Sequence, residues 1–307
     1  MDTTGRRAFL AGALGTLSVA VAGCGTPSAT ETRTPAPGPS SNGGASASPV
    51  TPQPTSAATP ATPSPTPTRT QPPSAKQIIQ RATVPVLCYH QLRNWTSNDT
   101  AYNRANLICP PKNFRRHLDA LVDGGWTTIT PDQYLAHLTT GAALPRKPVM
   151  LSFDDGTAGQ AREGLPQLAK RGLTGTFFVM TVVLDKPHWL STRDVKRMAA
   201  AGMTIGSHTY DHQAVTDLSG RDWKVQLEQS RETLRKASGQ SVRHFAYPYG
   251  TVSREAYRHL KSAGYRTAFQ LTAKPLDARA PLYTLRRLIV VSTWSGSTLV
   301  KHLSKRP

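Results

Sequence analysis

The sequence predicts an α/β fold built on parallel strands, and three observations support this. From about residue 83 onward, short apolar runs alternate with segments of helical spacing. The predicted helices end on glycines, which favour the left-handed conformation after a last helical turn. Polar motifs follow several predicted strands, and parallel sheets place their working residues at the carboxyl ends of strands. Candidate functional residues are therefore expected at those ends.

Seven predicted strands alternate with helices along the chain. A capping box at Thr130 and Gln133, with Pro131 at the first helical position, opens a helix that ends near Gly141. Another helix is predicted over about 221–238. Four helices are expected to end at Gly172, Gly202, Gly239 and Gly264, and the predicted strands are 84–89, 148–153, 174–180, 203–207, 242–247, 265–271 and 285–291.

The first 82 residues differ from the rest, since 13 of the 25 prolines lie between residues 25 and 75. Residues 1–23 combine Arg6-Arg7 with an apolar stretch too short to span a membrane. They resemble a twin-arginine lipoprotein signal peptide that ends before a lipidated Cys24; the alternative is an ordinary secretory signal with an incidental cysteine. Residues 24–82, rich in Pro, Thr, Ser and Ala, are expected to be a disordered linker, which leaves 83–307 as the folded domain.

Charge and cysteine content exclude several classes of protein. The chain has 37 Lys and Arg against 18 Asp and Glu, a net charge of +19, so its surface should attract anions. The positive residues are scattered and show no nucleic-acid-binding motif, so a nucleic-acid partner is not expected. Three cysteines exclude a disulfide scaffold. Cys88 and Cys109 are predicted to form either a disulfide or two thiols.

Two carboxylates follow the strand 148–153, in the motif SFDDG at 152–156. Adjacent side chains at a strand end diverge, so Asp155 could hold a metal while Asp154 faces a metal-activated water as a base. The alternative is a solvated Asp-Gly turn. The motif GSHTYDH at 206–212 also follows a strand, and it offers His208 and His212 to one ion; two surface histidines are the alternative here.

Two further strand ends carry candidate groups. The motif FAYPYG at 245–250 runs into a Pro/Gly loop whose backbone N–H groups can face a developing oxyanion. His90 ends the first strand, where a structural hydrogen-bonding role is the alternative to a catalytic one. Together, the four strand ends predict a hydrolytic metal site.

The ordered set of these motifs resembles the polysaccharide deacetylases of carbohydrate esterase family 4, the NodB homology domain. The resemblance implies a distorted (β/α)7-type barrel over residues 83–307 and a divalent metal, usually zinc. Asp155, His208 and His212 match the metal ligands of the family. Asp154 matches the general base, and the backbone amide of Tyr249 matches the oxyanion donor. Cobalt, nickel or iron would suit the same ligands.

The chain departs from the usual family pattern at two places. Many members have an arginine that orients the base where this chain has Ala246, so Arg286 or Arg287 is expected to take that role. Many members also take the general acid from a carboxyl-terminal histidine motif, which His302 matches poorly. His90 is the predicted acid, because the first strand resembles the poly-N-acetylglucosamine deacetylase branch, in which a histidine at that place supplies the acid.

The resemblance implies an exported, lipid-anchored, metal-dependent N-deacetylase on the outer face of the cytoplasmic membrane, facing the cell wall. It would release acetate from peptidoglycan or poly-N-acetylglucosamine. The alternatives are an O-acetyl xylan or chitin deacetylase, or a non-catalytic glycan-binding lipoprotein. The expected partners are the N-acetylated polysaccharide and, through the lipid, the membrane; the chain is expected to be a monomer.

Overall fold

The computed structural model describes residues 71–271 and 273–304. The predicted signal peptide, Cys24 and the linker as far as residue 70 lie outside the described residues. Within the described part of the chain, no helix is long and apolar enough to cross a membrane.

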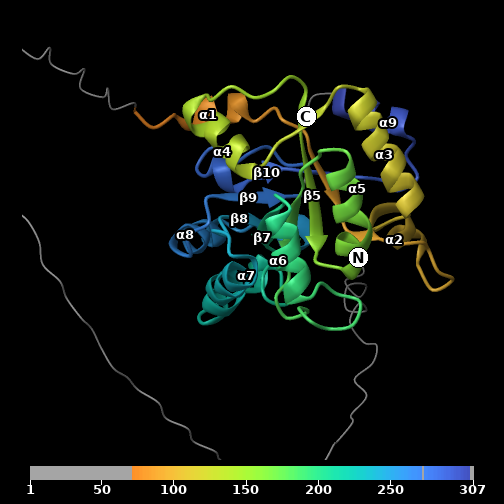
Figure 1. Ribbon diagram of the computed structural model, residues 1–307. Coiled ribbons are helices and arrows are strands. Elements are labelled where there is room, and N and C mark those ends of the chain that lie inside the picture. Colours follow the sequence, from red (N-terminus) through yellow and green to blue (C-terminus); the bar gives the residue numbers. More distant parts are fainter. Residues whose placement is uncertain (1–70, 272, 305–307) are drawn as a thin grey trace, which may run out of the picture. The chain divides into compact units, whose positions relative to one another are not determined.

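The fold is built on a parallel sheet that is nearly closed into a barrel, with helices around it (Figure 1). The strand order is β10-β9-β8-β7-β6-β5-β1-β11, with β4 paired to β5 and a separate β2–β3 pair. The predicted (β/α) barrel is therefore confirmed. The strands are β1 Val86–Tyr89, β2 Gln91–Leu92, β3 Ile108–Cys109, β4 Thr127–Thr128, β5 Pro148–Asp155, β6 Thr176–Val179, β7 Thr204–Ser207, β8 His244–Ala246, β9 Thr267–Gln270, β10 Leu285–Arg286 and β11 Leu288–Ile289.

The helices follow the predicted start and stop signals. Thr130 and Gln133 form the capping box, and Gly141 ends that helix in the left-handed conformation. The glycines at 172, 202, 239 and 264 all have positive φ. The helices are α1 Ala75–Arg81, α2 Ala101–Asn106, α3 Pro111–Asp123, α4 Pro131–Thr140, α5 Leu165–Lys170, α6 Thr192–Ala200, α7 Ser230–Ser238, α8 Arg254–Ser262 and α9 Gly296–Ser304.

Three boundaries differ from those predicted. Helix α1 lies in the range assigned to the linker, because Ile78 is buried against the apolar cluster that also contains Tyr134 of α4. The folded part therefore begins before residue 83. The helix expected over 221–238 begins as a π-helix, Lys224–Gln229, before it continues as α7. Arg287 splits the last predicted strand into β10, which pairs with β9, and β11, which pairs with β1. The two short strands therefore lie at opposite ends of the strand order.

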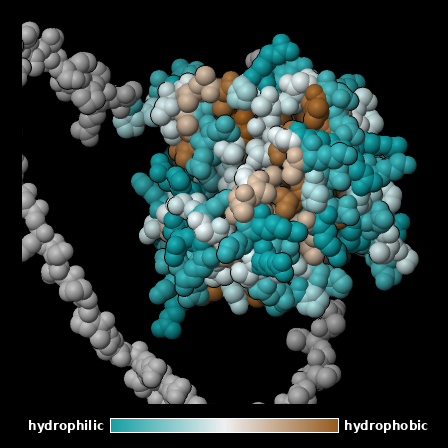
Figure 2. All heavy atoms as spheres, viewed as in Figure 1, coloured by the Kyte–Doolittle hydropathy of each residue, from teal (hydrophilic) through white to brown (hydrophobic). Residues whose placement is uncertain are grey.

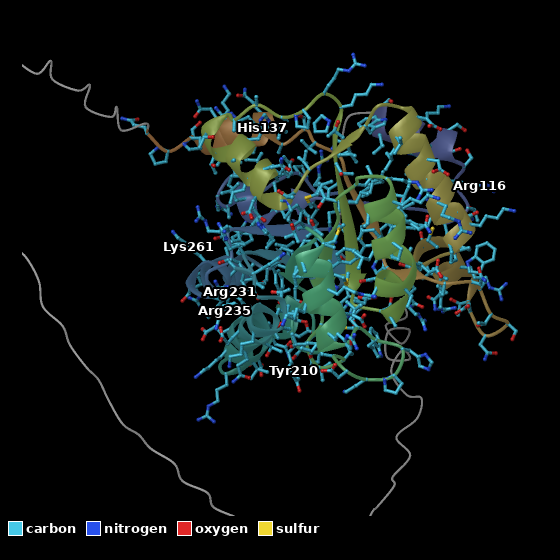
Figure 3. The ribbon with its side chains drawn as sticks, in the orientation of Figure 1. Arg116, His137, Tyr210, Arg231, Arg235 and Lys261 are labelled. Atoms are coloured by element: carbon cyan, nitrogen blue, oxygen red, sulfur yellow. The ribbon has the colours of Figure 1, made fainter. Side chains whose placement is uncertain are left out.

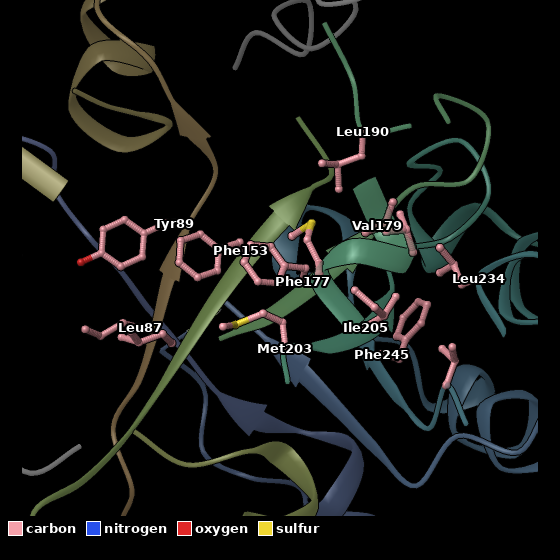
Figure 4. Close-up of a cluster of buried hydrophobic side chains, with 14 of the residues drawn as sticks. Leu87, Tyr89, Phe153, Phe177, Val179, Leu190, Met203, Ile205, Leu234 and Phe245 are labelled. Carbon is pink, nitrogen blue, oxygen red and sulfur yellow. The ribbon is translucent and has the colours of Figure 1, made fainter. Parts of the chain in front are cut away.

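Two apolar clusters cover the two faces of the sheet. The larger one lies between the strands and the surrounding helices and includes Phe153 of β5, Phe177 of β6 and Phe245 of β8 (Figure 4). The smaller one includes Val86, Met150, Phe178 and Phe269, which alternate along their strands with residues of the first cluster. The smaller cluster therefore fills the barrel interior. An apolar cavity of about 410 Å³ adjoins it beside β10 and β11.

The surface of the folded part is mostly hydrophilic on the face seen in Figure 2. Its cations do not gather at one place. Arg231 and Arg235 lie on α7 and Lys261 on α8, whereas Arg116 projects from α3 on another side of the barrel (Figure 3). This distribution agrees with the scattering of charge along the sequence.

Candidate active site

The two carboxylates at the end of β5 diverge as expected. The Asp154 side chain is fully buried, whereas that of Asp155 is 19% exposed. Asp155 has φ 77°, the left-handed region that side chains rarely adopt. Gly156 follows with φ 81°, and a Cβ there would lie 2.7 Å from Val179 of the next strand. This tight turn separates the two carboxylates.

His208 and His212 lie beside Asp155. The Nε2 atoms of His208 and His212 are 3.5 Å and 3.6 Å from Asp155 Oδ1. His208 Nδ1 is 2.8 Å from the Ala246 carbonyl oxygen. A carbonyl only accepts, so Nδ1 donates and the Nε2 lone pair of the neutral ring faces the carboxylate. The structure therefore brings together the three residues predicted to bind metal.

The chemistry of this group fits a divalent cation. Burial lowers the pKa of both imidazoles, that of His212 to about 4, so neither ring carries an extra proton at neutral pH. Asp155 Oδ1 is buried and has no hydrogen-bond partner among the described residues. Three lone-pair atoms that face one another repel unless a cation lies between them. Two imidazoles and one carboxylate, with one ring fixed by a carbonyl, suit zinc.

Arg287 holds Asp154 in a bidentate pair inside the barrel. Its two terminal nitrogens lie 2.6 Å from Oδ1 and 2.8 Å from Oδ2, and both side chains are fully buried. Burial would raise the pKa of Asp154, but the positive charge of Arg287 and its two hydrogen bonds outweigh burial and hold that pKa well below its usual range. Of the two arginines predicted for this role, Arg287 makes the contact.

His90 lies beside Asp154 at the end of β1. Its side chain is nearly buried, and its Nδ1 has no hydrogen-bond partner among the described residues. One of its ring nitrogens is within 4.8 Å of both the Asp154 carboxylate and the Cys88 thiol. His302 instead stacks on Trp294, with ring centroids 4.0 Å apart, on helix α9. The geometry therefore favours His90 over His302 as a group near the base.

The turn after β8 brings Tyr249 to the metal-binding group. Tyr249 has φ 58°, and its ring packs edge-on against His212 with centroids 4.5 Å apart. Gly250 follows with φ 67°, and a Cβ there would clash with the backbone of Leu271. Positive φ at Asp155, His212 and Tyr249 gathers strained backbone at one place, which is common at functional sites. The oxyanion role of Tyr249 stays a prediction.

Two buried glutamines that the sequence analysis missed support this site. Gln160 donates from Nε2 to the carbonyl oxygens of His90 and Asp154, at 2.9 Å and 2.5 Å. Gln226 accepts from the Tyr210 amide at 3.0 Å and donates to Asp211 at 2.8 Å. Both glutamines belong to π-helices, which often occur at functional sites. A polar residue inside an otherwise amphipathic helix is the only sequence signal for them.

The two cysteines of the domain are free thiols in the structure. Cys88 Sγ lies 3.5 Å from Asp154 Oδ2, inside the barrel. Cys109 is buried in β3, with its Sγ 3.9 Å from the Pro110 carbonyl oxygen. The structure therefore has two free thiols and no disulfide between Cys88 and Cys109.

A family model described as polysaccharide deacetylase matches residues 141–268. The chain carries a polysaccharide deacetylase domain. The matched segment contains Asp154, Asp155, His208, His212 and Tyr249, while His90 and Arg287 lie outside it. The match therefore covers the three predicted metal ligands and the adjacent carboxylate.

The chain is also similar to individual proteins. The putative polysaccharide deacetylase YxkH of Bacillus subtilis is 27% identical over 70% of this chain and 74% of its own length. A peptidoglycan-N-acetylglucosamine deacetylase of Bacillus cereus is 23% identical over 62% and 68% of the two chains. A poly-β-1,6-N-acetyl-D-glucosamine N-deacetylase of Staphylococcus epidermidis is 26% identical over 56% and 64%. The chain shares its fold with the Streptococcus pyogenes deacetylase PplD, whose structure was solved in complex with acetate. The TM-score is 0.67 and the sequences are 24% identical, and the similarity covers 72% of this chain and 98% of that one.

Proposed function

We propose that the protein is a metal-dependent N-deacetylase that hydrolyses the acetamide groups of an amino-sugar polysaccharide outside the cell. The observation that carries this proposal is the convergence of Asp155, His208 and His212 beside a buried carboxylate that an arginine clamps. Zinc is the expected metal. In each turnover, one water and one N-acetyl group give acetate and a free amine.

A divalent metal bound by Asp155, His208 and His212 would supply Lewis-acid activation of a water molecule and of the acetamide carbonyl. Asp154 takes the proton of the attacking water as general base, and Arg287 keeps this carboxylate ionised and oriented. His90, beside Asp154, gives a proton to the departing amine. The backbone N–H of Tyr249 stabilises the oxyanion.

The proposed substrate rests on the named relatives and on the two positions, His90 and Ala246, at which this chain departs from the usual family pattern. Relatives are named for peptidoglycan and for poly-N-acetylglucosamine. His90 at the end of the first strand and Ala246 in the third motif favour poly-N-acetylglucosamine. The net charge of +19 suits the anionic polymers of a cell wall. A lipid on Cys24 would hold the enzyme at the outer face of the cytoplasmic membrane.

The proposal is tested by measuring metal content and acetate release on the full chain. The substrates are poly-N-acetylglucosamine, peptidoglycan, chitin oligomers and acetylated xylan. We expect about one equivalent of tightly bound metal, and acetate from one of the first two polymers. Asp155→Ala should lose the metal. His90→Ala should keep it and lose rate, whereas equal loss of metal would contradict the role of His90 as acid.

Other outcomes would change the conclusion. Acetate from xylan or chitin alone would replace the proposed substrate. Bound metal with no acetate from any of the four polymers would favour a glycan-binding protein. Absence of metal from protein purified and reconstituted with zinc would overturn the assignment of the ligands. The lipid is tested separately, by intact-mass analysis of the exported protein: an unmodified Cys24 would exclude the anchor.

A further inference from the structure

A second group of metal-ligand side chains lies beside the first, since His208 Nε2 is 3.9 Å from Asp154 Oδ2. The Cys88 thiol, one ring nitrogen of His90 and a carboxylate oxygen of Asp154 all lie within 4.8 Å of one another. Cys88 in β1 and His90 just after it are two residues apart, so their side chains lie on the same face. Asp154 lies on the neighbouring strand β5. The two strands are parallel and in register, so their inward-facing side chains converge. The proposed metal group and general base leave Cys88 without a role.

Two members of this group, Cys88 and His90, have weak contacts for buried polar side chains. His90 is 9% exposed, and its Nδ1 has no hydrogen-bond partner among the described residues. Cys88 is fully buried, and its thiol lies 3.5 Å from Asp154 Oδ2 and 3.8 Å from the Tyr89 carbonyl oxygen. A buried imidazole nitrogen without a partner is costly. A cation held by Sγ, a His90 ring nitrogen and a carboxylate oxygen of Asp154 would give the thiol and the imidazole a partner, whereas Asp154 already has one in Arg287.

We propose that Cys88, His90 and Asp154 bind a second divalent transition metal of the zinc type, and that its binding inhibits the enzyme. Thiolate and imidazole select such metals over magnesium or calcium. The thiol proton leaves to solvent as the metal takes its place on sulfur. The inhibition, though not the binding, rests on the proposed function: a metal at this place would occupy both Asp154, the base, and His90, the acid.

The charges around the two groups determine which of them binds a metal ion more tightly. Arg287 lies 2.8 Å from the same Asp154 oxygen, so its positive charge opposes a cation on that oxygen. No arginine is recorded within salt-bridge distance of Asp155, and the first group is therefore the tighter one. The expected response to zinc is biphasic: activity rises with the first equivalent and falls as the second binds.

Cobalt reports directly on a thiolate ligand, since a cobalt–sulfur bond adds a charge-transfer absorption in the near ultraviolet. The full chain, freed of metal, is titrated with Co²⁺ while bound metal and absorption are measured. We expect two equivalents, with the charge-transfer band appearing only with the second. Cys88→Ser should lose the band and the second equivalent but keep the first, whose visible cobalt spectrum shows that the fold is intact.

Cys109→Ser is the matched control, because Cys109 is the other buried free thiol of the domain and lies outside this group. It should keep both equivalents and the band. A wild-type chain that binds one equivalent, or that binds two without a charge-transfer band, would overturn the proposed site. A band that persists in Cys88→Ser and disappears in Cys109→Ser would overturn it as well.

The inhibition is measured as the ratio of acetate release at excess zinc to acetate release at one equivalent. We expect this ratio to be low for wild type and for Cys109→Ser, and close to one for Cys88→Ser. An equal fall in Cys88→Ser would refute the inhibition. A chain that releases no acetate from any polymer but shows the cobalt–sulfur band would refute the proposed function and leave the metal site standing, so the two failures are distinguishable.

Discussion

The two faces of strand β5 differ in what they contribute to the molecule. Leu151 and Phe153 face the surrounding helices and belong to the large apolar cluster. Met150, Ser152 and Asp154 face the barrel interior, and along this face the side chains change from apolar to hydroxyl to carboxylate. As far as Phe153 the outer face is uniformly apolar, because it only has to be packed. The inner face changes because its carboxyl end borders the site.

This difference teaches how the barrel combines stability with chemistry. Burial of apolar area on the outer face stabilises the fold without placing any charge. A buried charge such as Asp154 opposes folding unless it is paired, and here Arg287 supplies the pair. The strands therefore carry a costly group only where function needs it. Substitutions on the two faces should therefore differ in whether they change stability, acetate release or both.

The largest effect is expected for Arg287→Met, on the inner face. It leaves Asp154 as an unpaired buried carboxylate, which should cost about 3–5 kcal/mol of stability, together with most of the acetate release. The double variant Asp154→Asn/Arg287→Met removes both charges and should regain much of that stability but none of the activity. Urea unfolding and acetate release measure the two effects. A double variant no more stable than Arg287→Met would contradict the charge pairing.

Phe153→Ala, on the outer face, should affect stability alone. Phe153 is fully buried, and its ring stacks on Phe177 with centroids 4.6 Å apart and on Tyr89 at 5.5 Å. The cavity should cost about 3–5 kcal/mol of unfolding free energy. Metal content and acetate release per folded molecule should stay near wild type. A loss of metal at full folding would show that the faces are not separable.

His90→Ala, at the rim of the inner face, should lower the rate and leave the fold and the tightly bound metal unchanged. Loss of a general acid lowers the rate by roughly 10²-fold or more, while Asp155, His208 and His212 are untouched. Unfolding should change little, because His90 makes few polar contacts. Acetate release and zinc content are measured on the same sample. A drop of less than about threefold would remove His90 from the mechanism.

The smallest effect is expected at His117, a buried polar residue of helix α3. This fully buried imidazole accepts from the Tyr89 hydroxyl at 3.3 Å and donates to the Trp294 carbonyl at 2.8 Å. Burial lowers the pKa of His117 in the folded state. Below a pH of about 6.5 the unfolded chain takes up a proton that the folded chain does not, so stability falls as pH falls.

The slope from His117 is at most about 1.4 kcal/mol per pH unit. His117→Gln removes this group while the other histidines remain. Its unfolding free energy should therefore fall less steeply than that of wild type between pH 7 and pH 5, as measured by urea unfolding at each pH. Parallel slopes for the two proteins would show that His117 does not contribute.

The predicted strands and turns were mostly right because local signals fix them. The capping box at Thr130 and the glycine at Gly141 depend only on neighbouring residues, and both lie where predicted. Helix α1 was missed because the burial of Ile78 depends on residues far along the chain. The π-helices were also missed, since Gln160 and Gln226 are held by the site loops and not by helical periodicity.

The sequence by itself determined the order of elements, the strand-end motifs and the group of Asp155, His208 and His212. Strand periodicity and turn residues are local, and parallel strands bring their carboxyl ends to one edge. Only the tertiary structure decided the partner of Asp154. Arg287 is 133 residues away, at the kink where one chain segment leaves β9 to pair with β1. Barrel closure turns its side chain inward, and no local pattern encodes such a closure.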